Sequence, residues 1–125
     1  MSRGLISIAV AGLALAALGA GAAQAQDVAH GQSLFQDRCS MCHVLGQIGQ
    51  GPDLVGVVGR KAGSLSGFNY TPALSGSGLV WTQANLQRFL TDPRAMVPGT
   101  AMRVKLNTPA DRQDLVAYLA TLKRH

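Results

Sequence analysis

The chain has 125 residues, of which 47% are hydrophobic and 14% charged, so it fits one small domain and is too apolar for an intrinsically disordered protein. Lys and Arg outnumber Asp and Glu by 11 to 6, which gives a net charge of +5, and every acidic residue is an Asp. This excess of positive charge favours an anionic partner without naming one. Two cysteines exclude a framework of several disulfides.

Residues 1–25 have the pattern of an export signal. Arg3 supplies a positive start, an uncharged apolar run follows, and Ala23-Gln24-Ala25 is a small-x-small cleavage pattern. We expect cleavage after Ala25, a mature domain of residues 26–125, and a periplasmic location. The alternative is an uncleaved membrane anchor, because an apolar run of about 20 residues is just long enough to span a bilayer.

The first half of the mature chain predicts one helix and a long loop. Asp27 to about Arg38 carries apolar residues at helical spacing, whereas the segment from Gly46 to Gly67 contains seven glycines and little periodicity. Thr71-Pro72 has the form of an N-cap followed by proline in the first helical turn, so a short helix is expected there.

The second half predicts three more helical segments. Thr82 caps a helix that turns Leu86, Phe89 and Leu90 inward, and Asp92-Pro93 ends this helix and caps one further turn. Thr108-Pro109 caps the final helix, with Lys123 and Arg124 near its negative end. No internal repeat or strand-like alternation is found, which predicts an all-α fold.

These elements leave a thin core. A domain of 100 residues (26–125) buries a modest share of its surface, and ordering the glycine-rich loops costs about 1–2 kcal/mol per residue in backbone entropy. A large apolar cofactor in the centre would supply the missing contacts.

The segment Cys39-Ser40-Met41-Cys42-His43 matches the C-x-x-C-H pattern of c-type haem attachment. Two thiols at this spacing can add to the two vinyl groups on one side of a porphyrin. The histidine that follows the second thioether then lies under the iron and can ligate it. The pattern therefore favours one covalently bound haem c.

Three other interpretations of this pattern stay open at this point. A thioredoxin-like redox pair needs a preceding strand and a βαβ context, neither of which the sequence shows. A structural zinc site needs a fourth ligand near His43, and only His30 and His125 remain. A plain disulfide would leave His43 unexplained.

A second axial ligand is expected from the two methionines of the mature chain outside the pattern. Met102 ends Pro98-Gly99-Thr100-Ala101-Met102, a turn that can present a thioether away from helical packing. Met96 lies next to Pro93 in or just after a helical turn, where methionine more often fills space. Met102 is therefore favoured over Met96.

The sequence resembles the small class I cytochromes c of the bacterial periplasmic and mitochondrial type over nearly all of residues 27–123. The resemblance rests on an ordered series of motifs around the C-x-x-C-H pattern: Gly31, Phe35, Gly51-Pro52-Asp53-Leu54, Gly56, Gly59-Arg60-Lys61-Ala62-Gly63, Gly67-Phe68-Asn69-Tyr70-Thr71, Trp81, Pro93, Pro98-Gly99-Thr100-Ala101-Met102 and Asp114-Leu115-Val116-Ala117-Tyr118-Leu119. It implies the small cytochrome c fold, with three to five helices packed around one haem and long Gly/Pro-rich loops.

The resemblance also implies roles for single residues. His43 and Met102 would be the axial ligands of the iron, and the carbonyl of Pro52 would accept the imidazole N–H of His43. The remaining implied residues surround the haem carboxylates, namely Arg60, Tyr70 and Trp81 at the inner propionate and Thr71 and Thr100 near the outer propionate and the methionine loop. Gly31 and Phe35 would cross Leu115 and Tyr118 where the first and last helices meet.

Some positions depart from the best-known members of that family. Phe89 and Leu74 stand where polar side chains are frequent, which predicts a dry pocket around the methionine, and Val104 replaces an exposed aromatic residue. The lysines are few, namely Lys61, Lys105 and Lys123, while Arg38, Arg94 and Arg103 partly restore a positive face.

The resulting prediction is a periplasmic one-electron carrier rather than an enzyme. We expect a monomer that binds no small-molecule substrate or nucleic acid and makes transient contacts with redox proteins through their acidic surfaces. The expected donors are a quinol-oxidising membrane complex or a periplasmic dehydrogenase, and the expected acceptors a terminal oxidase or a peroxidase. Two alternatives stay open: a dedicated electron-accepting subunit of one dehydrogenase, and a haem enzyme or gas sensor with a labile methionine ligand.

Overall fold

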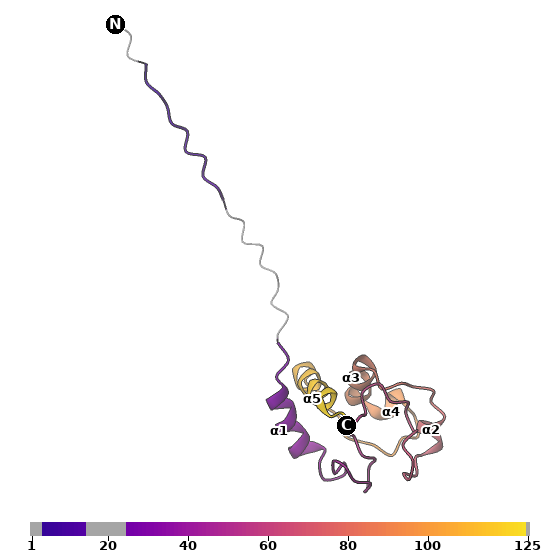
Figure 1. Ribbon diagram of the computed structural model, residues 1–125. Coiled ribbons are helices and arrows are strands. Elements are labelled where there is room, and N and C mark those ends of the chain that lie inside the picture. The colour runs from indigo at the N-terminus through magenta and orange to yellow at the C-terminus, as the bar shows by residue number, and fades with distance from the viewer. Residues whose placement is uncertain (1–3, 15–24, 125) are drawn as a thin grey trace.

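The computed structural model describes residues 4–14 and 25–124, and the second range folds into helices joined by long loops (Figure 1). The helices are α1 (Val28–Arg38), α2 (Pro72–Ser75), α3 (Gln83–Thr91), α4 (Pro93–Met96) and α5 (Pro109–Thr121). The prediction of an all-α fold is confirmed. Within the described ranges, the β pairing is limited to one isolated antiparallel bridge between Lys61 and Val80.

Four of the five helices have a side-chain N-cap, and three of these caps, Thr71, Thr82 and Asp92, were predicted from the sequence. The side chains of Asp27, Thr71, Thr82 and Asp92 each accept a hydrogen bond from the backbone N–H three residues later, at 2.9–3.4 Å. These bonds satisfy donors that the first helical turn would otherwise leave free.

The fifth helix differs from the prediction at its start. Thr108 occupies the N-cap position of α5, but its side chain makes no capping hydrogen bond, and Pro109 at the start removes one free donor instead. The helix ends at Thr121 with Leu122 as its C-cap, so Lys123 and Arg124 lie just beyond its negative end, as predicted. Arg124 finds a specific partner elsewhere, as described below.

Helices α1 and α5 pack directly on each other, as predicted (Figure 1). Gly31 is buried at the crossing, where a Cβ atom would overlap the backbone carbonyl of Asp114 and lie 2.9 Å from the Cβ of Tyr118. The ring of Phe35 packs against that of Tyr118, with centroids 5.6 Å apart. Glycine is therefore required for this close approach.

Asp114 also ties the start of α1 to α5. One carboxylate oxygen accepts the backbone N–H of Asp27 at 2.8 Å, and the other lies 2.8 Å from Nδ1 of His30. The hydrogen bond that His30 donates to the carboxylate of Asp114 is the main cause that raises the pKa of His30, and nearby Asp111 and Asp27 act in the same direction. Both partners therefore favour the ionised pair.

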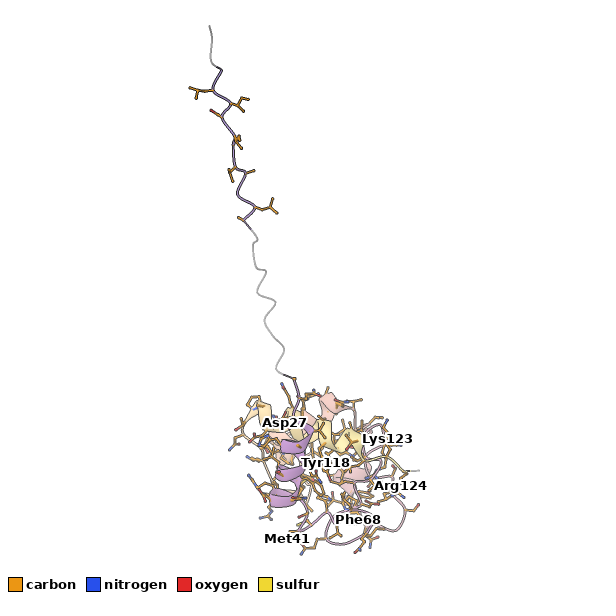
Figure 2. All side chains as sticks on the ribbon, turned by 60° about the vertical axis from the view of Figure 1, so that its left-hand side comes forward. Asp27, Met41, Phe68, Tyr118, Lys123 and Arg124 are labelled. Atoms are coloured by element: carbon orange, nitrogen blue, oxygen red, sulfur yellow. The ribbon has the colours of Figure 1, made fainter. Side chains whose placement is uncertain are left out.

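The predicted signal segment is described only in part. Residues 4–14 are extended and their apolar side chains are exposed (Figure 2). The cleavage pattern Ala23-Gln24-Ala25 lies outside the described residues except for Ala25. In the ranges that the structure covers, no helix combines the length and the apolarity needed to cross a membrane.

Replacing Gly31 with Ala is expected to destabilise the fold, although alanine ordinarily favours a helix over glycine by about 1 kcal/mol. The added Cβ meets the backbone of α5, so we expect the free energy of unfolding to fall by about 1–3 kcal/mol. Chemical denaturation measures this change. The exposed neighbour Gln32 is the control, since Gln32→Ala should alter stability by no more than about 0.5 kcal/mol. A Gly31→Ala protein as stable as the wild type would contradict the close packing.

The pair between His30 and Asp114 predicts a defined pH dependence. Because the pKa of His30 is raised in the folded protein, its contribution to stability is fully present below about pH 6.5 and is lost as the pH rises through the raised value. The pKa of Asp114 is lowered, chiefly by the N–H of Asp27 and then by His30, so the carboxylate persists well into the acid range. Thermal unfolding of wild type and His30→Gln should differ most near pH 5–6 and converge at alkaline pH. If the melting temperatures of the two proteins differ by the same amount at every pH, the pair between His30 and Asp114 does not contribute to stability as proposed.

Candidate haem-binding site

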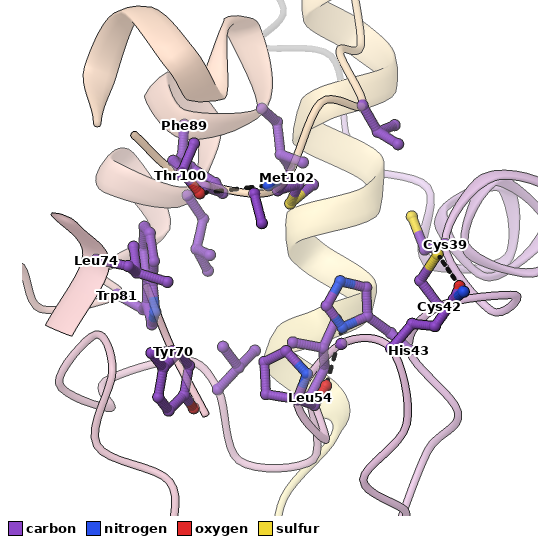
Figure 3. Close-up of a pocket in the computed structure, with 18 of the residues that line it drawn as sticks. Cys39, Cys42, His43, Leu54, Tyr70, Leu74, Trp81, Phe89, Thr100 and Met102 are labelled. Atoms are coloured by element: carbon purple, nitrogen blue, oxygen red, sulfur yellow. Dashed lines mark hydrogen bonds between the residues drawn. The ribbon is translucent and has the colours of Figure 1, made fainter. Parts of the chain in front are cut away.

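A cavity of about 550 Å³ lies in the middle of the domain, enclosed by α1, α3, α5 and the loops between them (Figure 3). Most of its surface is apolar, with side chains such as Phe35, Leu86 and Leu115 in its walls. All ten residues that the sequence singles out line this one space, namely Cys39, Cys42, His43, Pro52, Arg60, Tyr70, Thr71, Trp81, Thr100 and Met102. The structure thus brings them together, while their individual roles stay predictions.

The two cysteines lie on one side of the cavity, directly after α1. Cys39 is the C-cap residue of this helix and its side chain is buried, whereas Cys42 is exposed, and the two thiols are not joined in a disulfide. Burial raises the pKa of the Cys39 thiol to about 11. A redox-active cysteine needs a lowered pKa, so this environment argues against the thioredoxin-like interpretation.

His43 extends into the cavity from the same loop (Figure 3). Its Nδ1 lies 2.9 Å from the carbonyl oxygen of Pro52, and because that oxygen can only accept, Nδ1 carries the proton. Burial is the main cause that lowers the pKa of His43, which keeps the imidazole neutral at pH 7. The lone pair of Nε2 is therefore available to a metal.

Gly51 is a part of the site that the sequence did not single out as a site residue. A Cβ atom at this position would lie 2.5 Å from both Cε1 and Nδ1 of His43. Its backbone N–H donates to the carbonyl of Cys42 at 2.8 Å, which holds the two segments together. Glycine here leaves the room that the imidazole ring occupies.

The two candidate methionines lie in different surroundings. Met102 lines the cavity, and its backbone N–H donates to the hydroxyl of Thr100 at 3.4 Å. Figure 3 shows Met102 and His43 extending into the pocket from different sides. Met96 packs against the hydrophobic core at the end of α4 and is not part of the cavity wall. The geometry favours Met102 as the thioether ligand.

Arg60 gives one end of the cavity an unpaired donor. Its Nη2 donates to the carbonyl of Asp53 at 2.9 Å, while Nη1 is buried without a hydrogen-bond partner. Burial is the main cause that lowers the pKa of this guanidinium, because the charged form loses contact with water. Tyr70 and Trp81 line the same cavity (Figure 3). A buried donor without a partner is costly, so this end suits an anionic group such as a carboxylate.

The region around Met102 is apolar. Leu74 and Phe89 both line the cavity, and the ring of Phe89 packs on Trp81 with centroids 4.9 Å apart. Neither side chain offers a hydroxyl or an amide. This agrees with the expectation of a dry pocket.

Together these features fit a haem. The space is large and apolar, two thiols and a neutral imidazole stand on one side, a thioether reaches in, and an unpaired guanidinium meets the acidic edge that the porphyrin would present. Among the described residues, no group of three or more His, Cys and Asp side chains gathers as a metal site. His30 is bonded to Asp114 on the outside of α1, and His125 lies outside the described residues.

The sequence did not predict the pairing of Asp53 with Arg124, which was expected only to lie near the negative end of the last helix. Asp53 is buried, and its carboxylate accepts hydrogen bonds from the backbone N–H groups of Gly46 and Val55, at 2.8 and 2.9 Å, and from Nη2 of Arg124 at 3.0 Å. The only signal in the sequence was that a charged residue directly follows the Pro52 of a buried loop. Arg124 is 71 positions away, so no local pattern could pair the two.

Comparisons with known proteins agree with this geometry. The family model described as cytochrome c matches residues 28–123. The cytochrome c2 of Rhodomicrobium vannielii is 46% identical over 120 residues, covering 93% of this chain and 94% of that protein. Among solved structures, cytochrome cH from Methylobacterium extorquens has a TM-score of 0.73 at 43% identity, covering 76% of this chain and 98% of that one. The ferricytochrome c2 of Rhodopseudomonas palustris has a TM-score of 0.74 at 41% identity, covering 78% and 100%.

The family model spans nearly the whole helical domain, and the relatives match it along almost their full length. The chain belongs to the cytochrome c family, as an electron-carrier cytochrome with one covalently attached haem c.

Proposed function

We propose that this cytochrome carries single electrons in the periplasm, after cleavage behind Ala25 has left residues 26–125 as the mature domain. Its donor would be a quinol-oxidising membrane complex or a periplasmic dehydrogenase, and its acceptor a terminal oxidase or a peroxidase. When bound, the haem supplies an iron that cycles between the ferric and ferrous states. The observation that carries the proposal is the convergence of His43 and Met102 on one largely apolar cavity.

The chain's own residues suit a carrier that turns over no substrate. We assign Nε2 of His43 and the sulfur of Met102 as the two protein atoms that would hold the iron, which would leave no open position for a substrate molecule. The thioether is a soft ligand and favours the ferrous state. Leu74 and Phe89 add apolar surface to the cavity, and low polarity around the iron would disfavour the additional charge of the ferric state.

Arginines mark the side on which partners would dock. Arg38 and Arg103 are exposed and also contribute to the cavity wall, so their charges lie where the cavity meets the surface. Lys105 is less available than the sequence suggested, because its Nζ pairs with Asp92 at 3.0 Å. Arg94 is exposed on α4 but does not line the cavity. We therefore place the docking face around Arg38 and Arg103.

The N-terminal segment supports export. Residues 26–125 are 100 of 125 residues, or 80% of the chain, whereas the match to the cytochrome c2 of Rhodomicrobium vannielii covers 93%. The likeness therefore includes part of the segment that precedes residue 26. A relative that has a counterpart of this apolar segment supports a common export signal and a periplasmic carrier.

Replacing Met102 with Ala tests the ligand assignment and the function together. The change removes the soft ligand, so the reduction potential should fall, with each 59 mV corresponding to a factor of ten for one electron. Carbon monoxide should then bind to the reduced protein. The absorption band of iron–methionine ligation and a carbon monoxide titration measure both effects.

Met96→Leu is the matched control, because it keeps the volume of a packed side chain and should cost less than about 1.5 kcal/mol. It should leave the iron–methionine band intact. If Met96→Leu abolishes the band while Met102→Ala keeps it, the assignment is wrong. If the unmutated protein binds carbon monoxide rapidly, it has an open iron position and is not a pure electron carrier.

Charge reversal at the docking face should slow electron transfer to an anionic acceptor. We expect Arg38→Glu/Arg103→Glu to reduce the rate of oxidation by ferricyanide by up to about tenfold at low ionic strength, and salt to reduce this difference. Stopped-flow absorption measures the rate. Arg88→Glu on α3 introduces one charge reversal outside the cavity wall and should have a much smaller effect. Equal oxidation rates for the wild type and the double variant would contradict the placement of the docking face around Arg38 and Arg103.

A further inference from the structure

A buried carboxylate braces the loop that holds His43. Oδ1 of Asp53 accepts the N–H of Gly46, three residues after His43, and also the N–H of Val55. Asp53 directly follows Pro52, whose carbonyl oxygen accepts the Nδ1–H of His43. One side chain therefore joins the two segments on either side of the hydrogen bond that orients the imidazole.

Arg124, which follows α5, also bonds to Asp53 and to Val55 in this loop. After α5, Arg124 donates from Nη2 to Oδ2 of Asp53 at 3.0 Å and from Nε to the carbonyl of Val55 at 3.3 Å. Its aliphatic stem lies over Gly56, where an added Cβ would be 3.5 Å from Cγ of Arg124. The backbone N–H of Gly56 in turn donates to the carbonyl of Leu122 at 2.6 Å. The C-terminal segment thus contacts residues 53–56 through hydrogen bonds, an ion pair and the aliphatic part of Arg124.

The two charges are unequally exposed. The side chain of Asp53 retains 8% of its accessible surface and that of Arg124 57%. A buried carboxylate needs a cation or several donors to remain ionised. Among the side chains that the structure describes, Arg124 is the one that forms an ion pair with Asp53, since Arg60 bonds only its backbone carbonyl.

We propose that Arg124 is a positioning residue for His43, acting through Asp53 and Pro52. By holding the Asp53 carboxylate and the Val55 carbonyl, Arg124 keeps the Pro52 carbonyl in the place where it accepts the ring proton of His43. A histidine held by such a hydrogen bond is fixed in orientation and is a stronger donor to its metal. The inference rests on the proposed role of His43 as an axial ligand.

Hydrogen exchange of the Nδ1 proton of His43, followed by NMR in the reduced haem-loaded protein, tests the proposal. The variants are Arg124→Gln, Arg124→Lys and, as a control with the same change of charge, Lys123→Gln. Among the described residues, the hydrogen bonds and the ion pair of the Asp53 side chain do not include Lys123. The amide of Val116, which is fully buried in α5, reports opening of the whole fold.

Arg124→Gln should accelerate exchange of the His43 ring proton at least about tenfold relative to Lys123→Gln, because a charge-assisted bond to a buried group is lost. Exchange at Val116 should differ less than about twofold between the two variants. Arg124→Lys retains the charge and should lie between Arg124→Gln and the wild type. These three results together would support the role of Arg124 as a positioning residue for His43.

Equal exchange of the His43 proton in Arg124→Gln and Lys123→Gln overturns the proposal, and so does an acceleration that Val116 shares to the same degree, since that shows only a loss of overall stability. The proposed function fails separately. If the wild type lacks the iron–methionine band, the proposed ligation by Met102 fails, whereas a normal band with equal exchange in Arg124→Gln and Lys123→Gln overturns the role of Arg124 alone.

Discussion

The central cavity is the constraint on which the rest of the structure depends. A domain of about 100 residues with two long helices has too few side chains to fill its own centre, and the space of about 550 Å³ is bounded by segments from the whole chain. Helix α1, the loop of residues 44–70, α3 and the methionine loop all contribute walls. A bound haem would be the common surface against which these segments pack, so we expect folding to depend on binding of the cofactor.

The cavity wall changes in character from one side to the other, and each part has a different task. Leu74 and Phe89 contribute apolar wall without a hydroxyl or an amide. Around Arg60 it offers a buried donor, which suits an anionic edge. Beneath His43 a set of backbone and side-chain hydrogen bonds fixes the ring through Pro52. A one-electron carrier benefits from such rigidity, because little has to move when the charge on the iron changes.

Local patterns in the sequence predicted most of the helices and the attachment motif. The capping residues Asp27, Thr71, Thr82 and Asp92 act on N–H groups three positions away, so their effect is visible in a short stretch of sequence. The close spacing of the C-x-x-C-H pattern is likewise local. The turn that precedes Met102 also favoured this residue locally. The remaining cavity residues came from the resemblance to a known family, since nothing in their local sequence links Arg60 to Trp81.

What the sequence missed depends on contacts between distant positions. The pair between Asp53 and Arg124 joins a loop to the chain end, and the pair between Lys105 and Asp92 takes one predicted docking charge into an internal bond. Both need the folded backbone to bring the partners together. The side chain of Thr108 also shows that a favourable residue at an N-cap position does not guarantee the capping bond.

The most direct test of this account measures folding without the haem. A Cys39→Ser/Cys42→Ser chain freed of haem should give a far-ultraviolet circular dichroism spectrum with little helix and no cooperative unfolding transition, because the walls of the cavity lose the surface that they share. Added haem should restore helix. A haem-free chain with the helix content and cooperative transition of the attached protein would contradict the claim that the fold depends on filling this cavity.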